Sequence, residues 1–71
     1  MAREQYFVVS DAGQWRVNFR GNLYGYYPDA AAATAVAIDT AQKAGDAGLE
    51  AEVIVEQPNG NFQRAWLHTK Q

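Results

Sequence analysis

Residues 29–47 read DAAAATAVAIDTAQKAGDA, and this stretch decides the fold. Alanine is the best helix former, because it loses no side-chain entropy and buries no polar group. Pro28 disfavours the helical conformation for the residue before it, and Asp29 can accept hydrogen bonds from the free N–H groups of a first turn. Gly45 and Gly48 are typical of a helix C-terminus. The sequence therefore predicts one helix from about Asp29 to Ala47.

The two sides of this helix differ in chemistry. Asp39, Lys43 and Asp46 fall on one side, and Asp39 precedes Lys43 by four residues in the favourable acid-first order. The other side is mostly methyl groups, which allow the helix backbone close to its partner, so the partner must supply the bulk of the core. An aromatic-rich sheet is the simplest partner, and a second copy of the helix is the alternative. The small side consists of Ala30, Ala33, Thr34, Ala37, Ile38, Ala41 and Ala44.

Five stretches rich in β-branched and aromatic residues predict strands on both sides of the helix. In the second stretch, Trp15, Val17 and Phe19 alternate with polar residues, which is typical of a strand with one buried side. We expect a tight turn at Gly21-Asn22 between the second and third stretches. The strands are expected at residues 5–10 (QYFVVS), 15–20 (WRVNFR), 23–26 (LYGY), 49–57 (LEAEVIVEQ) and 61–67 (NFQRAWL).

Alternation also assigns sides to the last two strands. In the fourth, an apolar set of Leu49, Ala51, Val53 and Val55 alternates with an outer set of Glu50, Glu52 and Glu56, and Ile54 is the exception. In the fifth, Phe62, Arg64 and Trp66 are expected to share one side.

The element order predicts the fold class α+β, a β-β-β-α-β-β two-layer sandwich with one Ala-rich helix packed on a curved, mostly antiparallel sheet. A crossover to a parallel strand should be right-handed. Residues 1–71 form one domain, and residues 68–71 are expected to be a frayed tail. The closing hairpin can join beside the first strand or beside the third, and the sequence leaves both open.

Composition narrows the class of protein. The 71 residues include no Cys, which excludes disulfides and thiolate metal sites. No apolar run reaches membrane-spanning length, and the N-terminal residues 1–5 do not resemble a signal peptide, so we expect a cytoplasmic protein without membrane contact. The net charge of −2 argues against a dedicated nucleic-acid binder.

Catalytic motifs are scarce. The chain has one His, His68, and one Ser, Ser10, which is not in a nucleophile-elbow context. No phosphate-binding spacing surrounds Gly21 or Gly25. The carboxylates of the outer set on the fourth strand are interpreted as a solvated side that blunts edge pairing, with metal binding as the alternative. We therefore expect a protein that is not an enzyme, with no catalytic residue, no cofactor and no metal.

The most informative polar set lies on the second and third strands. Arg16, Asn18 and Arg20 alternate along one side, and Tyr24 is expected nearby. Arg can bind guanine, Asn can bind adenine, and Tyr can stack on bases, so this set is a candidate nucleic-acid or partner contact. The alternative is a solvated side whose Arg stems cover aromatic edges and pair with Glu across strands.

The WRV stretch at Trp15–Val17, GNLYGYYP at Gly21–Pro28, the Ala-rich helix and NGNF at Asn59–Phe62 resemble a small bacterial family of uncharacterised proteins. In that family a W-x-V hairpin precedes an Ala-rich helix and a closing hairpin. The resemblance implies this fold and a bacterial origin, and it carries no activity. The β-β-β-α half also resembles the arm-site DNA-binding domains of phage-type integrases, which are basic, whereas only Arg16 and Arg20 stand on the corresponding side here.

Together these patterns favour a small non-enzymatic domain that acts through protein contacts, with an unidentified protein or a second copy as partner. An aromatic-rich sheet with edge strands open to pairing favours a homodimer. The alternative function is a nucleic-acid-binding module that uses the outer side of the second strand.

Overall fold

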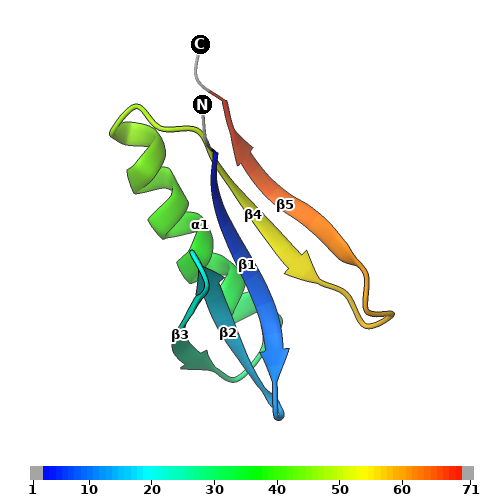
Figure 1. Ribbon diagram of the computed structural model, residues 1–71. Helices are drawn as coiled ribbons and strands as arrows, with labels where there is room; N and C mark the ends of the chain where they lie inside the picture. The colour runs from blue at the N-terminus through cyan, green and yellow to red at the C-terminus, as the bar shows by residue number, and fades with distance from the viewer. Residues whose placement is uncertain (1–2, 70–71) are drawn as a thin grey trace.

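The computed structural model describes residues 3–69 and confirms the α+β class (Figure 1). Within these residues, five strands form one sheet, and a single helix packs on one side of it. The elements are β1 (Glu4–Asp11), β2 (Gln14–Phe19), β3 (Asn22–Tyr27), α1 (Ala30–Asp46), β4 (Ala51–Glu56) and β5 (Phe62–His68).

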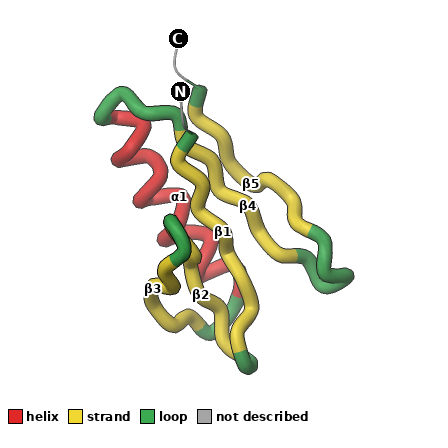
Figure 2. Tube along the Cα trace, viewed as in Figure 1, coloured by secondary structure: helices red, strands yellow, loops and turns green. Residues whose placement is uncertain are grey.

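The strands lie in the order β3-β2-β1-β4-β5 (Figure 2). β4 runs parallel to β1, with Tyr6 opposite Val53, and the other three pairings are antiparallel. The closing hairpin therefore joins beside the first strand. The sheet is mostly antiparallel, as predicted, and the first and last hairpins extend it to opposite edges from the central β1–β4 pair.

Both ends of α1 are capped by the residues that the sequence indicates. Asp29 lies just before the helix, and its Oδ1 accepts a hydrogen bond from the Ala32 N–H at 2.8 Å. At the other end, the Gly48 N–H donates to the Gly45 carbonyl at 2.9 Å, and the N–H of the following residue donates back to the last turn. Gly48 has a φ of +91°, which a glycine adopts without a steric penalty.

The core lies between the alanine side of α1 and the middle of the sheet. Ala33, Ala37 and Ala41 are completely buried, as are Val8 and Val53 beneath them. Because the alanine side chains are short, the helix lies close to the sheet and the bulk comes from strands, as expected. One contribution is the pair of stacked rings of Tyr6 and Phe19, whose centroids are 4.4 Å apart.

Several local predictions were wrong. The turn between β2 and β3 is Arg20-Gly21, both with positive φ, and not Gly21-Asn22. Opposite Val53 and Ile54 of β4, a register shift leaves Ala65 of β5 unpaired, so Arg64 and Trp66 do not share one side. Leu49 lies before β4 and is exposed, so it does not belong to the buried apolar set.

The shift in β5 reverses the side of Trp66. Trp66 pairs with Val53 and packs on the core, whereas Arg64 pairs with Ile54 on the other side. β5 also extends through His68, whose ring stacks on that of Trp66, so the prediction that His68 belongs to a frayed tail was wrong. Residues 70 and 71 of that expected tail lie outside the described residues.

Candidate functional site

One side of the sheet has no helix over it in the described part of the chain, and we call this side the open face. In Figure 1 the strands lie in front of α1, so the open face is toward the viewer. On β1 and β4 its residues alternate with buried core residues such as Val8 and Val53. Phe62 is 53% exposed and meets Phe7 edge to face, with ring centroids 6.1 Å apart. The apolar members of the open face on β1, β4 and β5 are Phe7, Val9, Ile54, Phe62 and Leu67.

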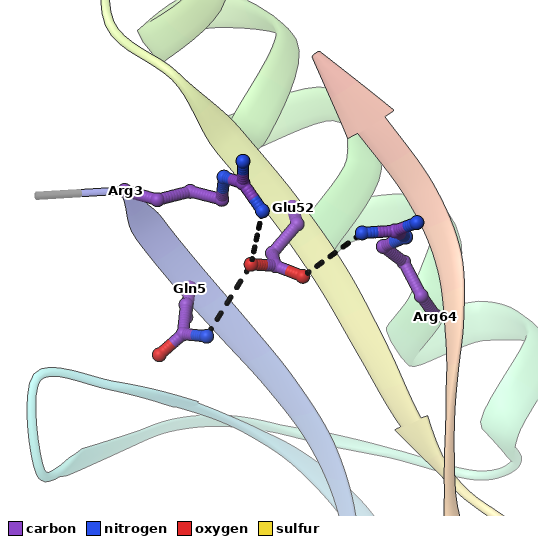
Figure 3. Close-up of polar contacts among 4 residues, drawn as sticks. All are labelled: Arg3, Gln5, Glu52 and Arg64. Atoms are coloured by element: carbon purple, nitrogen blue, oxygen red, sulfur yellow. Dashed lines mark hydrogen bonds and ion pairs between the residues drawn. The ribbon is translucent and has the colours of Figure 1, made fainter. Parts of the chain in front are cut away.

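A nearly buried carboxylate lies on the same face as this apolar group, and Figure 3 shows it with its polar partners. Glu52 on β4 is only 7% exposed, although it lies on the side of the sheet away from α1. Its Oε2 accepts from Arg3 and from Gln5, each at 3.3 Å, and its Oε1 lies 3.8 Å from Arg64 Nη1. Charged groups out of water need such partners. The negative charge of Glu52 is therefore compensated by side chains that flank β4 on both sides.

Arg16 is held by its own hairpin. Its Nε donates to the Gly25 carbonyl at 3.0 Å, and its Nη2 donates to the Leu23 carbonyl at 3.3 Å. Its Nη1 lies 3.4 Å from a carboxylate oxygen of Asp11, and its Cζ lies 4.3 Å from the centroid of the Tyr26 ring. With 17% of its side chain exposed, Arg16 fastens the edge strand β3 to the sheet.

Arg20 lies apart from Arg16, because the tight turn removes it from the alternation of β2. Its guanidinium forms an ion pair with Glu4 and lies over the ring of Phe19. The hydrogen bond to Glu4 and the nearby negative charge raise the pKa of Arg20. The positive charge of Arg20 is therefore already paired with an acidic residue of the same chain.

The four residues of the predicted contact set do not form one surface. Asn18 pairs with Leu23 on the open face, beside Arg16. Tyr24 pairs with Val17, which is buried under α1, so Tyr24 lies on the helix side of the sheet. Arg20 is in the turn. The structure thus brings two of the four together and separates the other two.

Both edges of the sheet are irregular. β3 carries one extra residue opposite the Trp15–Val17 segment of β2, and β5 carries the extra residue Ala65. Bulges at sheet edges and side chains that occupy edge backbone groups oppose pairing with another strand. On β3, two carbonyls already accept from Arg16. The edges are therefore less suited to pairing than the sequence suggested, and the open face becomes the candidate interaction surface.

A hollow that the sequence did not indicate lies on the helix side of the sheet, between α1 and β3. Its volume is about 330 Å³. Three phenol rings and one phenyl ring contribute to its walls, and α1 lines one side of it. We call it the aromatic pocket; the residues that shape it are Tyr6, Phe19, Tyr24, Tyr27, Val36 and Thr40. The YGYY stretch was the available signal, but its rings could not be assigned to a side without the bulge.

Burial raises the pKa of the Tyr6 phenol above its usual value. The negative charge of Glu4 raises this pKa further, and the positive charge of Arg20 opposes the change. The phenol therefore stays protonated and remains a hydrogen-bond donor at neutral pH.

Comparison of the chain with protein-family models, curated proteins and solved structures found no match. In residues 3–69, no helix is both long and apolar enough to cross a membrane. Within the same range, no three acidic or histidine side chains gather in a way that could hold a metal ion.

Proposed function

We propose that the protein is a non-enzymatic interaction domain that forms a homodimer by packing the open faces of two copies together. The observation that carries this proposal is the apolar group on the uncovered side of the sheet, with Phe62 more than half exposed at its margin. Two sheets that pack face to face bury such side chains about 10 Å apart, as in sandwich proteins. The dimer would have the layers helix, sheet, sheet, helix.

The charges of the open face support self-association. A two-fold interface places a surface against its own copy, so an unbalanced charge would face a like charge. Here Glu52 lies between two Arg side chains, and Arg16 pairs with Asp11. Glu56 accepts from the backbone N–H of Ser10 at 3.0 Å. Cations and anions are therefore balanced within each copy.

The size of the face sets the expected affinity. Five strands of about six residues, with spacings of about 4.8 Å between strands and 3.3 Å along them, give a flat area of roughly 500 Å². A standard interface buries about 800 Å² on each partner. We therefore expect a weak dimer, whose population rises with protein concentration over the micromolar range and above.

Sedimentation equilibrium of the full chain over a range of concentrations tests this proposal. Phe62→Glu places a charge in the apolar group and should shift the chain to monomer at every concentration. Leu49→Glu is the matched control, because Leu49 is an exposed apolar residue in the connection before β4. This control should associate like the wild type. A wild-type chain that stays monomeric at millimolar concentration would refute the proposal.

Nucleic-acid binding through Arg16, Asn18, Arg20 and Tyr24 is the alternative function, and the geometry supports it less well. Binding to phosphates needs cationic side chains that can displace the counterions condensed on the nucleic acid. Arg16 and Arg20 already have acidic partners in the chain. Fluorescence anisotropy with short duplex DNA and single-stranded RNA at low salt tests it. A salt-sensitive complex that the double variant Arg16→Ala, Arg20→Ala abolishes would favour this alternative over the dimer.

A further inference from the structure

The aromatic pocket is built by the irregularity in β3. Val17 pairs with Tyr24 and Trp15 pairs with Tyr27, so two residues three positions apart share the helix side of the sheet. In a regular strand, residues three apart point to opposite sides. The extra residue between them turns Tyr27 toward α1, which is a known use of bulges near functional sites.

Gly25 makes this arrangement possible. Its φ is +71°, a conformation that other residues rarely adopt. A Cβ on Gly25 would lie 2.5 Å from Cε2 of Tyr27, because the Tyr27 ring rests directly on the glycine. The position of Tyr27 in the pocket wall therefore depends on the absence of a side chain at Gly25.

The wall chemistry selects an uncharged ligand. Among residues 3–69, no Asp, Glu, Lys or Arg lines the pocket, and a buried charge without a partner is costly. Aromatic walls favour a flat ring, which can stack or meet them edge to face. The volume of about 330 Å³ is roughly twice that of a cavity known to hold benzene, which fits a bicyclic ring.

Polar groups are also available at the pocket. The Thr40 hydroxyl donates to the Val36 carbonyl at 3.0 Å within α1. No hydrogen bond joins the hydroxyl groups of Tyr6, Tyr24 or Tyr27 to another residue in the described part of the chain. A few hydroxyl groups in a mostly apolar site are typical of small-molecule pockets, where they fix the orientation of the ligand.

We propose that the aromatic pocket binds a small, uncharged, bicyclic aromatic molecule with one hydrogen-bonding group, for which indole is the simplest probe. The site lies on the helix side of the sheet and is separate from the open face. It therefore does not depend on the proposed dimer, and each proposal can fail while the other stands.

An amide NMR titration of the full chain with indole tests the site. Saturable shifts should centre on Tyr24, Tyr27 and the Val36–Thr40 segment of α1. Val36→Trp should weaken binding about tenfold or more by filling the pocket. Gln42→Trp is the control, since Gln42 is an exposed α1 residue that does not line the pocket, and its binding should equal that of the wild type.

Two further variants distinguish the aromatic pocket from the open face as the place where indole binds. Phe62→Glu should bind indole as the wild type does, because Phe62 lies on the open face. Tyr24→Ala removes an exposed edge-strand side chain from the pocket wall and should weaken binding. No saturable shift up to the solubility limit of indole, shifts confined to the open face, or binding of tetramethylammonium but not indole would each overturn the proposal.

Discussion

The guanidinium of Arg16 lies over the ring of Tyr26, with 4.3 Å between its Cζ and the ring centroid. The same group donates to the carbonyls of Leu23 and Gly25, so one side chain spans the edge strand β3. This contact secures the irregular part of β3, which also shapes the aromatic pocket. Arg16 therefore supports the fold, although the sequence marked it as a candidate contact residue.

Arg16→Lys should lower the free energy of unfolding by about 1–2 kcal/mol, because a lysine ammonium cannot reproduce the planar fork of donors. The measurement is urea unfolding followed by tryptophan fluorescence. Arg64→Lys is the matched control, since Arg64 is half exposed and lies 3.8 Å from its Glu52 partner. The control should change stability by less than about 0.5 kcal/mol. Equal effects of the two substitutions would contradict the role of Arg16.

Gly25→Ala should destabilise the protein by two separate causes. The positive φ costs about 1 kcal/mol for any other residue, and the added Cβ would collide with the Tyr27 ring. Gly60→Ala isolates the first cause, because Gly60 has a φ of +85° and no atom within 4 Å of an added Cβ. Thermal unfolding should show a larger loss for Gly25→Ala by about 1–2 kcal/mol. A loss no larger than that of Gly60→Ala would mean that Tyr27 moves freely.

Asp29→Ala should cost about 1 kcal/mol, because it leaves the Ala32 N–H without its acceptor at the start of α1. Asp39→Ala is the comparison within the same helix. Asp39 pairs with Lys43 in an exposed i,i+4 contact, which is worth a few tenths of a kcal/mol. Chemical denaturation of both variants checks the order. If Asp39→Ala proved the more damaging, the cap would not control helix stability.

Alkaline pH should destabilise the folded protein through Tyr6. Burial raises the pKa of Tyr6 in the folded state above its value of about 10 in the unfolded chain. The unfolded chain therefore releases this proton first, and the free energy of unfolding falls as pH rises through about 10. Below that pH, Tyr6 contributes no pH dependence.

Unfolding measured between pH 8 and pH 11 tests this, with Tyr6→Phe expected to reduce the alkaline slope. An unchanged slope in Tyr6→Phe would remove Tyr6 as the cause.

The fold was predictable where local rules apply. Asp29 and Gly48 mark the ends of α1, and the alternation of Trp15, Val17 and Phe19 assigns the helix side of β2. Strand order was not predictable, since both placements of the closing hairpin satisfy the same local pattern. Only the long-range pairing of β1 with β4 distinguishes them.

The candidate site was less predictable, because bulges change sides within a strand. Strict alternation predicts Trp66 on the same side of β5 as Arg64, but the extra residue between them puts the two side chains on opposite sides. A similar shift in β3 places Tyr24 and Tyr27 on the helix side together. The tight turn at Arg20-Gly21 likewise removes Arg20 from the side of Arg16. Composition alone cannot show that the cations of this set are already paired.

Intermolecular contacts between labelled and unlabelled copies test the proposed dimer most directly. An isotope-filtered NOE experiment on a mixed sample detects only contacts that cross the interface. We predict cross-peaks that connect Phe7, Ile54, Phe62 and Leu67 of one copy with the same group of residues of the other. Cross-peaks from α1 or from the strand edges instead, or their complete absence at millimolar concentration, would contradict association through the open face.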